Sequence, residues 1–383
     1  MKIAFIQHSF GFTSGIDTVT YELSKRISKK HDVTIFTFNN EYDSNIGIEI
    51  KESSIPFKKN RVFNAVLSPI FIHKIAEIQK SIKKYDVVNS HMYPANIIPL
   101  LPTKIENPLN VVIAWSTEPI KLFPKLTEKL YFAFLKKANG YAVKRADEVI
   151  APCDFVKQWI KKDYGVEATE MFLDGVNFDL FDKKTSGDSI YHKYPFLEDS
   201  PVILYVGRLT PHKNIDILIK SFKIVKSDIP DAKLVIVGKK SFLRYFEYLK
   251  RLVRDENLEK DVLFTDVVPW VDLPKYYTIC DVYATCSQWE GFLRAEAFAM
   301  EKPIVAFDVT SHGETVKHRK NGLLVKEQTP EAFANALIEL LLDDNLRRVM
   351  GRNGYKWAKE NLDFDVIAEN FMNFVENKWR ARR

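Results

Sequence analysis

The sequence predicts an α/β protein built of two doubly wound domains with parallel sheets. The chain has 383 residues, more than one hydrophobic core usually serves. Short apolar runs alternate with segments whose apolar residues recur at helical spacing, a pattern typical of parallel strands joined by helices. The alternation starts again in the second half of the chain, and 46% of all residues are hydrophobic, enough for two cores.

The first domain is expected to open with a strand–helix–strand unit. Residues 3–7 form a short apolar run, apolar residues recur at helical spacing over 16–27, and residues 33–38 have the pattern of a second strand. Further strands are expected at residues 86–89, 111–115 and 148–151. We assign this domain to residues 1–185.

The second domain repeats this pattern beyond a polar, turn-rich stretch at residues 182–188, which we interpret as part of the linker. A strand at 201–206, a helix with apolar residues over 215–225 and a strand at 233–238 follow in order. We assign this domain to residues 186–362. Ligands of doubly wound sheets bind at the carboxyl ends of strands, so the loops after strands are where chemistry is expected.

The chain is mildly basic, and its charge is unevenly distributed. Lys and Arg number 56 against 50 Asp and Glu, a formal net charge of +6. Residues 1–185 hold 26 basic and 21 acidic residues, a net +5, which leaves +1 for the rest. So small an excess does not indicate a nucleic-acid partner, although it is compatible with phosphorylated ligands or an anionic membrane surface. The basic first half suggests an acidic or membrane-borne acceptor.

Cysteine usage and hydrophobic segments predict a cytoplasmic protein. The three cysteines have no C-x-x-C spacing and predict neither a disulfide framework nor a thiolate zinc site. The apolar run at the N-terminus is too short for the core of a signal peptide. The most apolar uncharged stretch, residues 87–103, contains three prolines, so no transmembrane helix is expected.

Several common catalytic motifs are missing. Gly11 and Gly15 do not spell G-x-G-x-x-G, which disfavours a nicotinamide dehydrogenase, and residues 238–241 lack the first glycine of a P-loop. The eight histidines include no H-E-x-x-H pair. Asp363 and Asp365 spell D-x-D, but we interpret them as carboxylates that stabilise the N-terminus of a last helix. We predict neither a cofactor nor a metal site.

The first informative motif is a glycine with two cations in the loop after the strand at 201–206. Gly207 lets a ligand approach the backbone, and Arg208 and Lys213 supply the positive charge that a diphosphate needs. A solvent-exposed basic loop without a ligand would have the same composition.

The second informative motif spans residues 287–303. Glu290 precedes a glycine-containing turn, and Glu296 opens an expected helix. Carboxylates placed in this way can accept hydrogen bonds from sugar or ribose hydroxyls. A turn residue and a helix N-terminal charge are the structural alternatives.

With these two motifs the chain resembles the family-four retaining glycosyltransferases, or glycosyl transferases group 1, which have the GT-B fold. Residues 205–214 are similar to the family's G-R-L-x-x-x-K-N element, and residues 287–303 to its E-G-F-G-L...E-A...G-x-P element. Shorter matches in family-like order extend the resemblance over nearly the whole chain, at residues 146–151, 174–177, 267–273 and 314–325. The resemblance implies two Rossmann-like domains facing a central cleft, with the last helix, 363–383, packed on the first domain.

The resemblance also implies a role for each matching residue. Arg208 and Lys213 would neutralise the diphosphate of a nucleotide-sugar donor. Glu296 would accept the ribose hydroxyls, and Glu290 would contact or position the donor sugar. The other implied site residues are Gly207, Gly291 and Phe292 in the donor loops, Gly15 in the N-terminal loop near the donor phosphate, and the catalytic His91 of the family's D-x-x-H-x-H element. A single histidine after a strand is otherwise more often structural.

The chain departs from the family pattern at several of these positions. Five residues separate Glu290 from Glu296 where the family has seven, and the second glycine of the turn is missing. Asn89 replaces the first histidine of the N-terminal element, and Ser116 stands where a further histidine is usual. These differences bear on sugar and acceptor specificity more than on reaction class.

The resemblance therefore predicts a metal-independent enzyme of glycan biosynthesis, and the cysteine usage predicts that it is cytoplasmic. Such an enzyme moves a sugar, with retention of configuration, from a UDP-, GDP- or ADP-linked donor to a hydroxyl of a glycan or lipid-linked acceptor. Two alternatives stay open: a sugar-nucleotide epimerase of the same fold, and a non-catalytic nucleotide-sugar-binding protein. An epimerase would interconvert sugars without an acceptor, and a binding protein would catalyse neither reaction.

A basic and aromatic segment at residues 121–145 suggests peripheral contact with an anionic membrane. Seven Lys and Arg side chains alternate there with Phe, Leu and Tyr, as in amphipathic helices that lie on lipid. An ordinary helix packed on the first sheet is the alternative.

Overall fold

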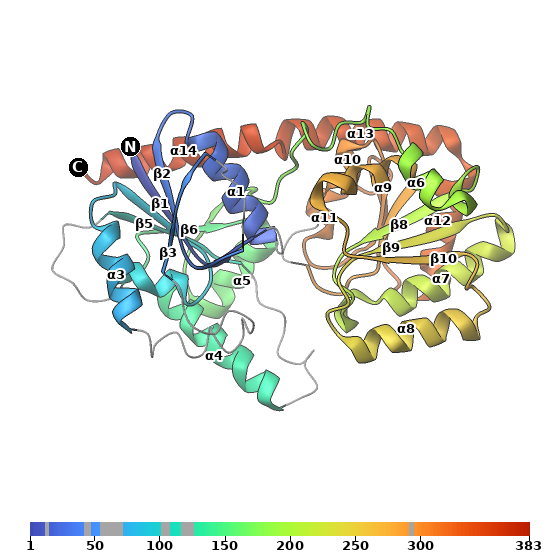
Figure 1. The fold of residues 1–383 in the computed structure, drawn as a ribbon, viewed down its shortest axis with the longest axis horizontal. Coiled ribbons are helices and arrows are strands. Elements are labelled where there is room, and N and C mark those ends of the chain that lie inside the picture. Colours follow the sequence, from blue (N-terminus) through green and yellow to red (C-terminus); the bar gives the residue numbers. More distant parts are fainter. Residues whose placement is uncertain (12–14, 42–46, 54–71, 101–107, 116–125, 291–294) are drawn as a thin grey trace. The chain divides into compact units, whose positions relative to one another are not determined.

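A computed structural model describes residues 1–11, 15–41, 47–53, 72–100, 108–115, 126–290 and 295–383. The chain forms two compact units, one of Met1–Gly175 with Phe364–Arg383 and the other of Val176–Asp363. Each unit has its own parallel sheet and its own hydrophobic core (Figure 1). The predicted class, two α/β domains with parallel sheets, is confirmed. The stretch at residues 182–188 that we interpreted as linker lies inside the second unit.

The first unit is built on a seven-stranded parallel sheet. In sheet order its strands are β3 (Glu49–Glu52), β2 (Asp32–Asn40), β1 (Lys2–Phe10), β4 (Val87–Ser90), β5 (Leu109–Ile113), β6 (Glu148–Ala151) and β7 (Thr169–Glu170). Five of these strands lie where apolar runs predicted them. The edge strands β3 and β7 were not predicted because they are short and largely polar.

Helices cover both faces of this sheet. The helices are α1 (Gly15–Ile27), α3 (Ile72–Ile82), η2 (Ala95–Leu100), α4 (Leu126–Val143), α5 (Asp154–Tyr164) and α14 (Phe364–Ala381). Leu23 of α1 and Phe371 of α14 pack with Phe5 on one face. Ile78 of α3 and Ile98 of η2 pack in the core of the other face. Among the described residues, no helix combines the length and hydropathy needed to cross a membrane.

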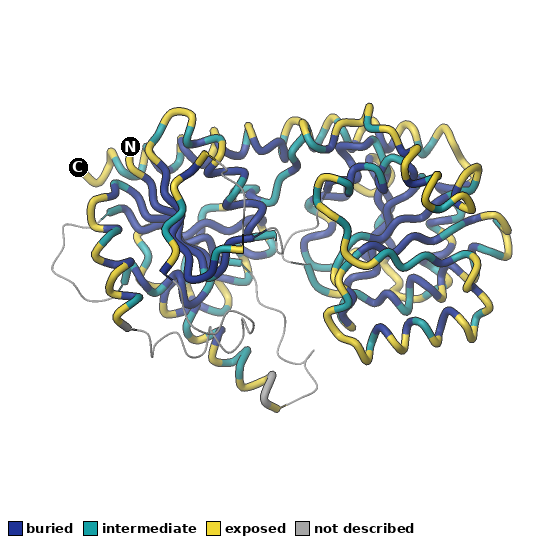
Figure 2. Tube along the Cα trace, viewed as in Figure 1, coloured by how far each residue is buried: buried dark blue, intermediate teal, exposed yellow. Residues whose placement is uncertain are grey.

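The second unit is built on a six-stranded parallel sheet. In sheet order its strands are β10 (Val262–Asp266), β9 (Lys233–Val237), β8 (Val202–Val206), β11 (Val282–Thr285), β12 (Ile304–Phe307) and β13 (Gly322–Val325). The strands predicted at 201–206 and 233–238 correspond to β8 and β9. β8 and β9 are largely buried within the unit, and exposed residues lie on the outer faces of the helices (Figure 2).

The helices of the second unit alternate with its strands. They are α6 (Asp188–Lys193), η4 (Pro195–Leu197), η5 (Pro211–Lys213), α7 (Ile215–Asp228), α8 (Leu243–Asp255), η6 (Trp270–Asp272), α9 (Leu273–Ile279), α10 (Glu296–Ala299), α11 (His312–Thr315), α12 (Pro330–Leu342) and α13 (Asp344–Asn361). α7, α8 and α12 contribute apolar side chains to the core cluster that the strands share.

Each sheet reverses its strand order at one point, between β1 and β4 in the first unit and between β8 and β11 in the second. In doubly wound sheets the carboxyl ends of the strands at such a point form the usual ligand edge. The loops that leave β8 and β11 are therefore the first place to look for a site in the second unit.

Candidate functional site

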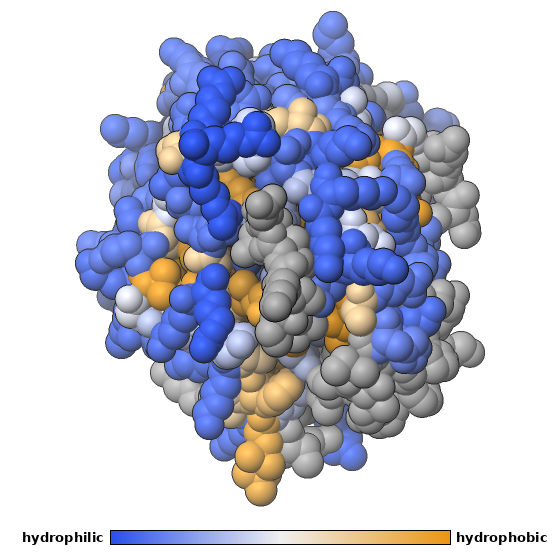
Figure 3. All heavy atoms as spheres, turned by 90° about the vertical axis from the view of Figure 1, so that its left-hand side faces the viewer, coloured by the Kyte–Doolittle hydropathy of each residue, from blue (hydrophilic) through white to orange (hydrophobic). Residues whose placement is uncertain are grey.

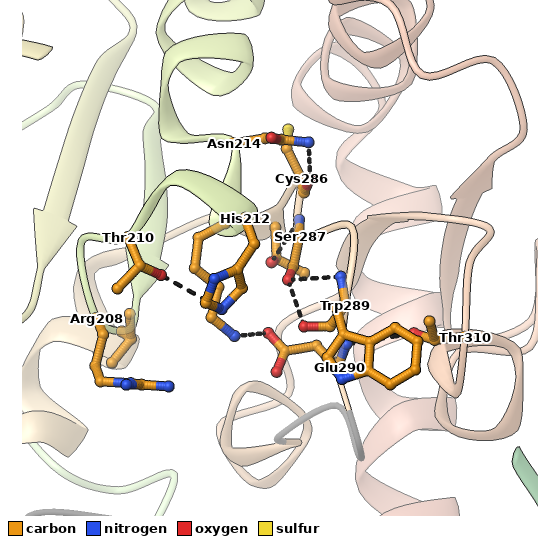
Figure 4. Close-up of polar contacts among 12 residues, drawn as sticks. Arg208, Thr210, His212, Asn214, Cys286, Ser287, Trp289, Glu290 and Thr310 are labelled. Carbon is orange, nitrogen blue, oxygen red and sulfur yellow. Dashed lines mark hydrogen bonds and ion pairs between the residues drawn. The ribbon is translucent and has the colours of Figure 1, made fainter. Parts of the chain in front are cut away.

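Two loops meet at the carboxyl ends of β8 and β11 (Figure 4). One runs from Gly207 to η5, and the other runs from β11 to Glu290. The amide of Gln288 donates to the carbonyl of His212 over 2.9 Å, so the two loops are joined through the backbone. The two motifs that stood out in the sequence therefore lie at one edge of the sheet.

The loop after β8 is shaped by a buried tyrosine and a close approach of two glycines. The hydroxyl of Tyr205, a residue 2% exposed, donates to the carbonyl of Arg208 over 3.2 Å. Gly238 has φ +152°, and a Cβ there would lie 1.8 Å from the carbonyl oxygen of Gly207, so this approach requires glycine. Arg208 is exposed, and its guanidinium extends toward the side on which Glu290 lies (Figure 4).

Asn214 sets the corner between η5 and α7. Its backbone is left-handed, with φ 50° and ψ 45°, a conformation that Asn tolerates better than most residues. Its side-chain Nδ2 donates to the carbonyl of Cys286 over 3.1 Å, which adds a second link between the two loops. The preceding residue, Lys213, is thereby held at a fixed place beside the loop after β11.

Lys213 and Glu290 form an ion pair through Nζ and Oε1. Their side chains are 11% and 22% exposed, so the pair is largely shielded from water. Burial, the largest effect, would raise the pKa of Glu290. The charge and hydrogen bond of Lys213, with smaller contributions from His312 and His212, outweigh burial and hold the pKa of Glu290 below its ordinary value. Glu290 is therefore a carboxylate at neutral pH.

Thr310 and Ser311 hold the backbone of Glu290, and sequence reasoning missed both. The amide of Glu290 lies 3.4 Å from Oγ1 of Thr310, to which it donates, and Oγ of Ser311 donates to the carbonyl of Glu290 over 3.3 Å. The available signal was the pair of small polar residues Thr310 and Ser311, which follows Asp308 and Val309 after the apolar run at 304–307. That signal is weak because most loops share it.

The structure brings together some, but not all, of the predicted site residues. Gly207, Arg208, Lys213 and Glu290 share the edge just described. Glu296 is the first residue of α10 and is buried, with 2% of its surface exposed. Gly291 and Phe292 lie outside the described residues. Gly15 and His91 belong to the first unit, where Gly15 opens α1.

His91 lies just after β4 and is buried between two partners of the first unit. Nε1 of Trp115 donates to Nδ1 of His91 over 3.1 Å, so the ring proton is on Nε2, which lies 3.1 Å from Oγ1 of Thr20. Burial lowers the pKa of His91 to about 3. This geometry favours a neutral, fixed imidazole, and a catalytic role for His91 stays a prediction.

The described residues contain no group of three or more His, Cys, Asp or Glu side chains that could hold a metal ion. Within the D-x-D sequence, Asp363 forms an ion pair with Lys359 and Asp365 forms one with Arg26. Each carboxylate therefore has a cation of its own unit beside it.

The protein has two α/β units with parallel sheets, and a glycine and two cations lie at the switch point of the second sheet. These features define a protein of the GT-B class. The chain is similar to sucrose-phosphate synthase from Thermosynechococcus elongatus, with a TM-score of 0.84 and 20% identity over 99% of both chains. It is also similar to Anabaena HepE in complex with UDP and glucose, with a TM-score of 0.81 and 20% identity over 98% of this chain and 100% of HepE. At these identities the likeness establishes the fold.

Family comparison identifies the chain more closely. The model described as Glycosyl transferases group 1 matches residues 188–357, and the one described as Glycosyltransferase Family 4 matches residues 13–179. The chain belongs to the family-four glycosyltransferases, which confirms the resemblance seen in the two motifs.

Two curated relatives match over part of their length. The chain is 30% identical over 235 residues to putative glycosyltransferase YtcC of Bacillus subtilis, covering 56% of each protein. It is 27% identical over 246 residues to the GDP-mannose-dependent α-(1-6)-phosphatidylinositol monomannoside mannosyltransferase of Mycobacterium tuberculosis, covering 62% of this chain and 63% of that protein. Both alignments span less than two thirds of the relative.

Proposed function

We propose that the protein is a retaining glycosyltransferase that moves a sugar from a nucleoside diphosphate donor to a hydroxyl of a glycan or lipid-linked acceptor. One observation carries the proposal: at the switch point of the second sheet, Lys213 pairs with Glu290, and the guanidinium of Arg208 extends toward the side on which Glu290 lies. Membership of the family-four glycosyltransferases supports it.

The two cations suit the charge that develops as the donor reacts. When the bond from the anomeric carbon to the diphosphate oxygen breaks, negative charge accumulates on the leaving group. η5 and Asn214 fix the position of Lys213, and Arg208 is exposed in the loop after β8, so both cations would act on that group. Interactions that strengthen as charge develops lower the barrier, so both residues would raise turnover more than binding.

The configuration at the anomeric carbon is retained if the acceptor attacks on the face from which the diphosphate leaves. The bond from the acceptor oxygen to the anomeric carbon forms on that face, and the acceptor proton passes to the leaving phosphate. Glu290 would hold the donor sugar, and Glu296 would accept hydrogen bonds from the ribose hydroxyls. No metal enters this scheme, because Arg208 and Lys213 supply the positive charge.

The donor base and the acceptor are proposed only as classes. The mycobacterial relative is named for GDP-mannose and a phosphatidylinositol monomannoside, and HepE was crystallised with UDP and glucose. These names support a UDP- or GDP-linked donor, with an ADP-linked donor as the third candidate, and a glycan or lipid-linked acceptor.

Proton NMR of a panel of UDP-, GDP- and ADP-sugars tests the proposed reaction. We expect one donor to be consumed faster when acceptor is added, with release of nucleoside diphosphate and the anomeric coupling of the donor retained in the product. A metal chelator should leave the rate unchanged. Interconversion of sugars without acceptor would identify an epimerase instead, and binding without turnover would identify a binding protein.

Helix α4 supports a further part of the proposal, peripheral contact with an anionic membrane. Leu126, Leu130 and Phe134 are 71%, 62% and 41% exposed and recur every four residues, so they share one face. Figure 3 shows hydrophobic surface gathered at the N-terminal end of α4. Exposed Lys129 and Lys137 lie beside this stripe. An apolar stripe with basic neighbours is the pattern of helices that lie on anionic lipid.

The opposite face of α4 packs inside the first unit, as the alternative interpretation expected. Leu135 is 7% exposed, and Ala142 and Val143 are buried. The face with these buried residues therefore holds the helix on the first unit, and the outer face, with Leu126, Leu130 and Phe134, is exposed to solvent. We propose that this outer face contacts the cytoplasmic side of a membrane that carries the acceptor.

A further inference from the structure

The segment Thr310–Ser311–His312 reaches Glu290 from the neighbouring strand and has no part in the function proposed above. It follows β12, which lies beside β11 in the sheet. The hydroxyl of Thr310 accepts from the amide of Glu290, and the hydroxyl of Ser311 donates to its carbonyl. Both backbone polar groups of Glu290 are thus held by side chains of this one segment.

Thr310 has a strained backbone. Its φ is +50°, in the left-handed region, which is unfavourable for a β-branched residue. Glycine would adopt this conformation without strain, but glycine has no hydroxyl to receive the amide of Glu290. A strained residue that contacts a site residue is the kind of outlier that indicates function rather than packing.

His312 anchors the segment to the sheet. Its side chain is fully buried, and Nδ1 lies 2.7 Å from the carbonyl oxygen of Phe307, the last residue of β12. Nδ1 therefore carries the proton and donates it, while Nε2 has no hydrogen-bond partner among the described residues. Burial, the largest effect, lowers the pKa of His312 although the carboxylate of Glu290 opposes this. At neutral pH the ring thus anchors the segment without adding charge beside Lys213 and Glu290.

We propose that Thr310 and Ser311, anchored by His312, are positioning residues that fix Glu290 in its pairing with Lys213. The inference rests on the proposed function, in which this ion pair acts on the donor sugar and diphosphate. A loose Glu290 would leave Lys213 less precisely placed against the leaving group, and small errors in placement cost catalysis heavily.

Substitutions at Thr310 separate backbone strain from the hydroxyl. Thr310→Gly relieves the strain and removes Oγ1, whereas Thr310→Ser keeps Oγ. We expect T310G to melt at the same or a higher temperature than the wild type while its kcat falls roughly ten- to a hundredfold. Ser311→Ala should lower kcat similarly, and T310S should stay within about twofold, since it keeps the contact. Asn257→Gly is the matched control. It relieves the strain of another left-handed backbone position (φ 57°), at the end of α8, and should not change kcat.

A second readout needs no substrate. If the segment fixes Glu290, a carbon-13 NMR titration of its carboxyl should show the pKa moving up in T310G and S311A, because the pairing with Lys213 loosens. The pKa should not move in T310S or N257G. An unchanged pKa together with an unchanged kcat in T310G and S311A would overturn the inference. A wild type that transfers sugar from no donor of the panel, with the pKa shifts present, would count against the proposed function alone.

Discussion

Lys213 and Glu290 are 77 residues apart in the sequence and form one ion pair at the carboxyl ends of β8 and β11. The strand order explains the pairing, because β11 enters the sheet beside β8 on the side opposite β9. The cation and its carboxylate are therefore held in place by the fold, and little reorganisation is left for the moment of reaction.

Replacing Lys213 by Met should reverse the direction of the pKa shift of Glu290. In the wild type the lysine outweighs burial and the pKa lies below its ordinary value. Without the lysine, burial remains as the largest effect, so the pKa should rise above that value. A carbon-13 NMR titration of the carboxyl measures it. Lys240→Met, which breaks the exposed ion pair with Asp266, is the control. A Glu290 pKa that stays low in K213M would contradict this account.

The same ion pair should make stability depend on pH in a definite direction. A carboxyl whose folded pKa is lowered stabilises the fold above its unfolded pKa, ordinarily 4.5, and this contribution is lost as the pH falls through the folded pKa. The difference in free energy of unfolding between the wild type and Glu290→Gln should thus be present at pH 7 and shrink in acid. Urea titrations of both proteins at pH 7 and below pH 4.5 measure this difference in the free energy of unfolding. A difference that grows on acidification would refute the assignment.

Removing either cation should slow sugar transfer more than it weakens donor binding. Arg208→Ala and Lys213→Ala are each expected to lower kcat by roughly ten- to a thousandfold, the scale of lost electrostatic donors, because they act mainly on charge that develops in the transition state. Steady-state kinetics with the donor found in the panel measures this. Lys250→Ala on α8, which removes an exposed cation paired with Glu247, should behave as the wild type does. Wild-type kcat in R208A or K213A would exclude that residue from the reaction.

Sequence reasoning identified Lys213 and Glu290 because each belongs to a local pattern, Lys213 in a glycine-containing basic loop after a strand and Glu290 before a glycine-containing turn. It could not identify Thr310 and Ser311, because their hydroxyls matter only through contacts that depend on β12 lying beside β11. The left-handed backbone of Thr310 is likewise invisible in the sequence, since a β-branched residue predicts the opposite.

The first unit shows the same limit. The sequence located His91 after a strand, which the structure confirms, but it did not predict that Thr20 and Trp115 would take up both ring nitrogens. Those partners come from α1 and from just beyond β5, so only the packed fold brings them to His91. The polar edge strand Glu49–Glu52 was missed because it contains a single apolar residue, which is too few to give an alternating pattern.

His91 should make the fold less stable in mild acid. Its folded pKa is about 3 against an ordinary 6.5, so between these values the unfolded chain binds a proton that the folded chain does not. Stability should therefore fall as the pH drops below 6.5, by up to about 1.4 kcal/mol per pH unit from this residue. Urea titrations of His91→Gln between pH 7 and pH 4 should show a shallower dependence than the wild type. His192→Gln, at an exposed histidine of the second unit, is the control and should keep the wild-type dependence. An equally steep loss in H91Q would contradict the prediction.

The outer face of α4 should determine binding to anionic vesicles. Burying an exposed leucine in an apolar phase is worth about 1.5–3 kcal/mol, so the double variant Leu126→Ser, Leu130→Ser should lower the partition coefficient at least about tenfold in flotation with phosphatidylserine-containing vesicles. Leu243→Ser on α8 matches Leu126 in exposure, 70% against 71%, and should float as the wild type does. Neutralising Lys129 and Lys137 should weaken binding to anionic but not to zwitterionic vesicles, because their contribution is electrostatic. If the double leucine variant floats like the wild type, a surface other than α4 makes the contact, and a glycan acceptor free in solution becomes the better hypothesis.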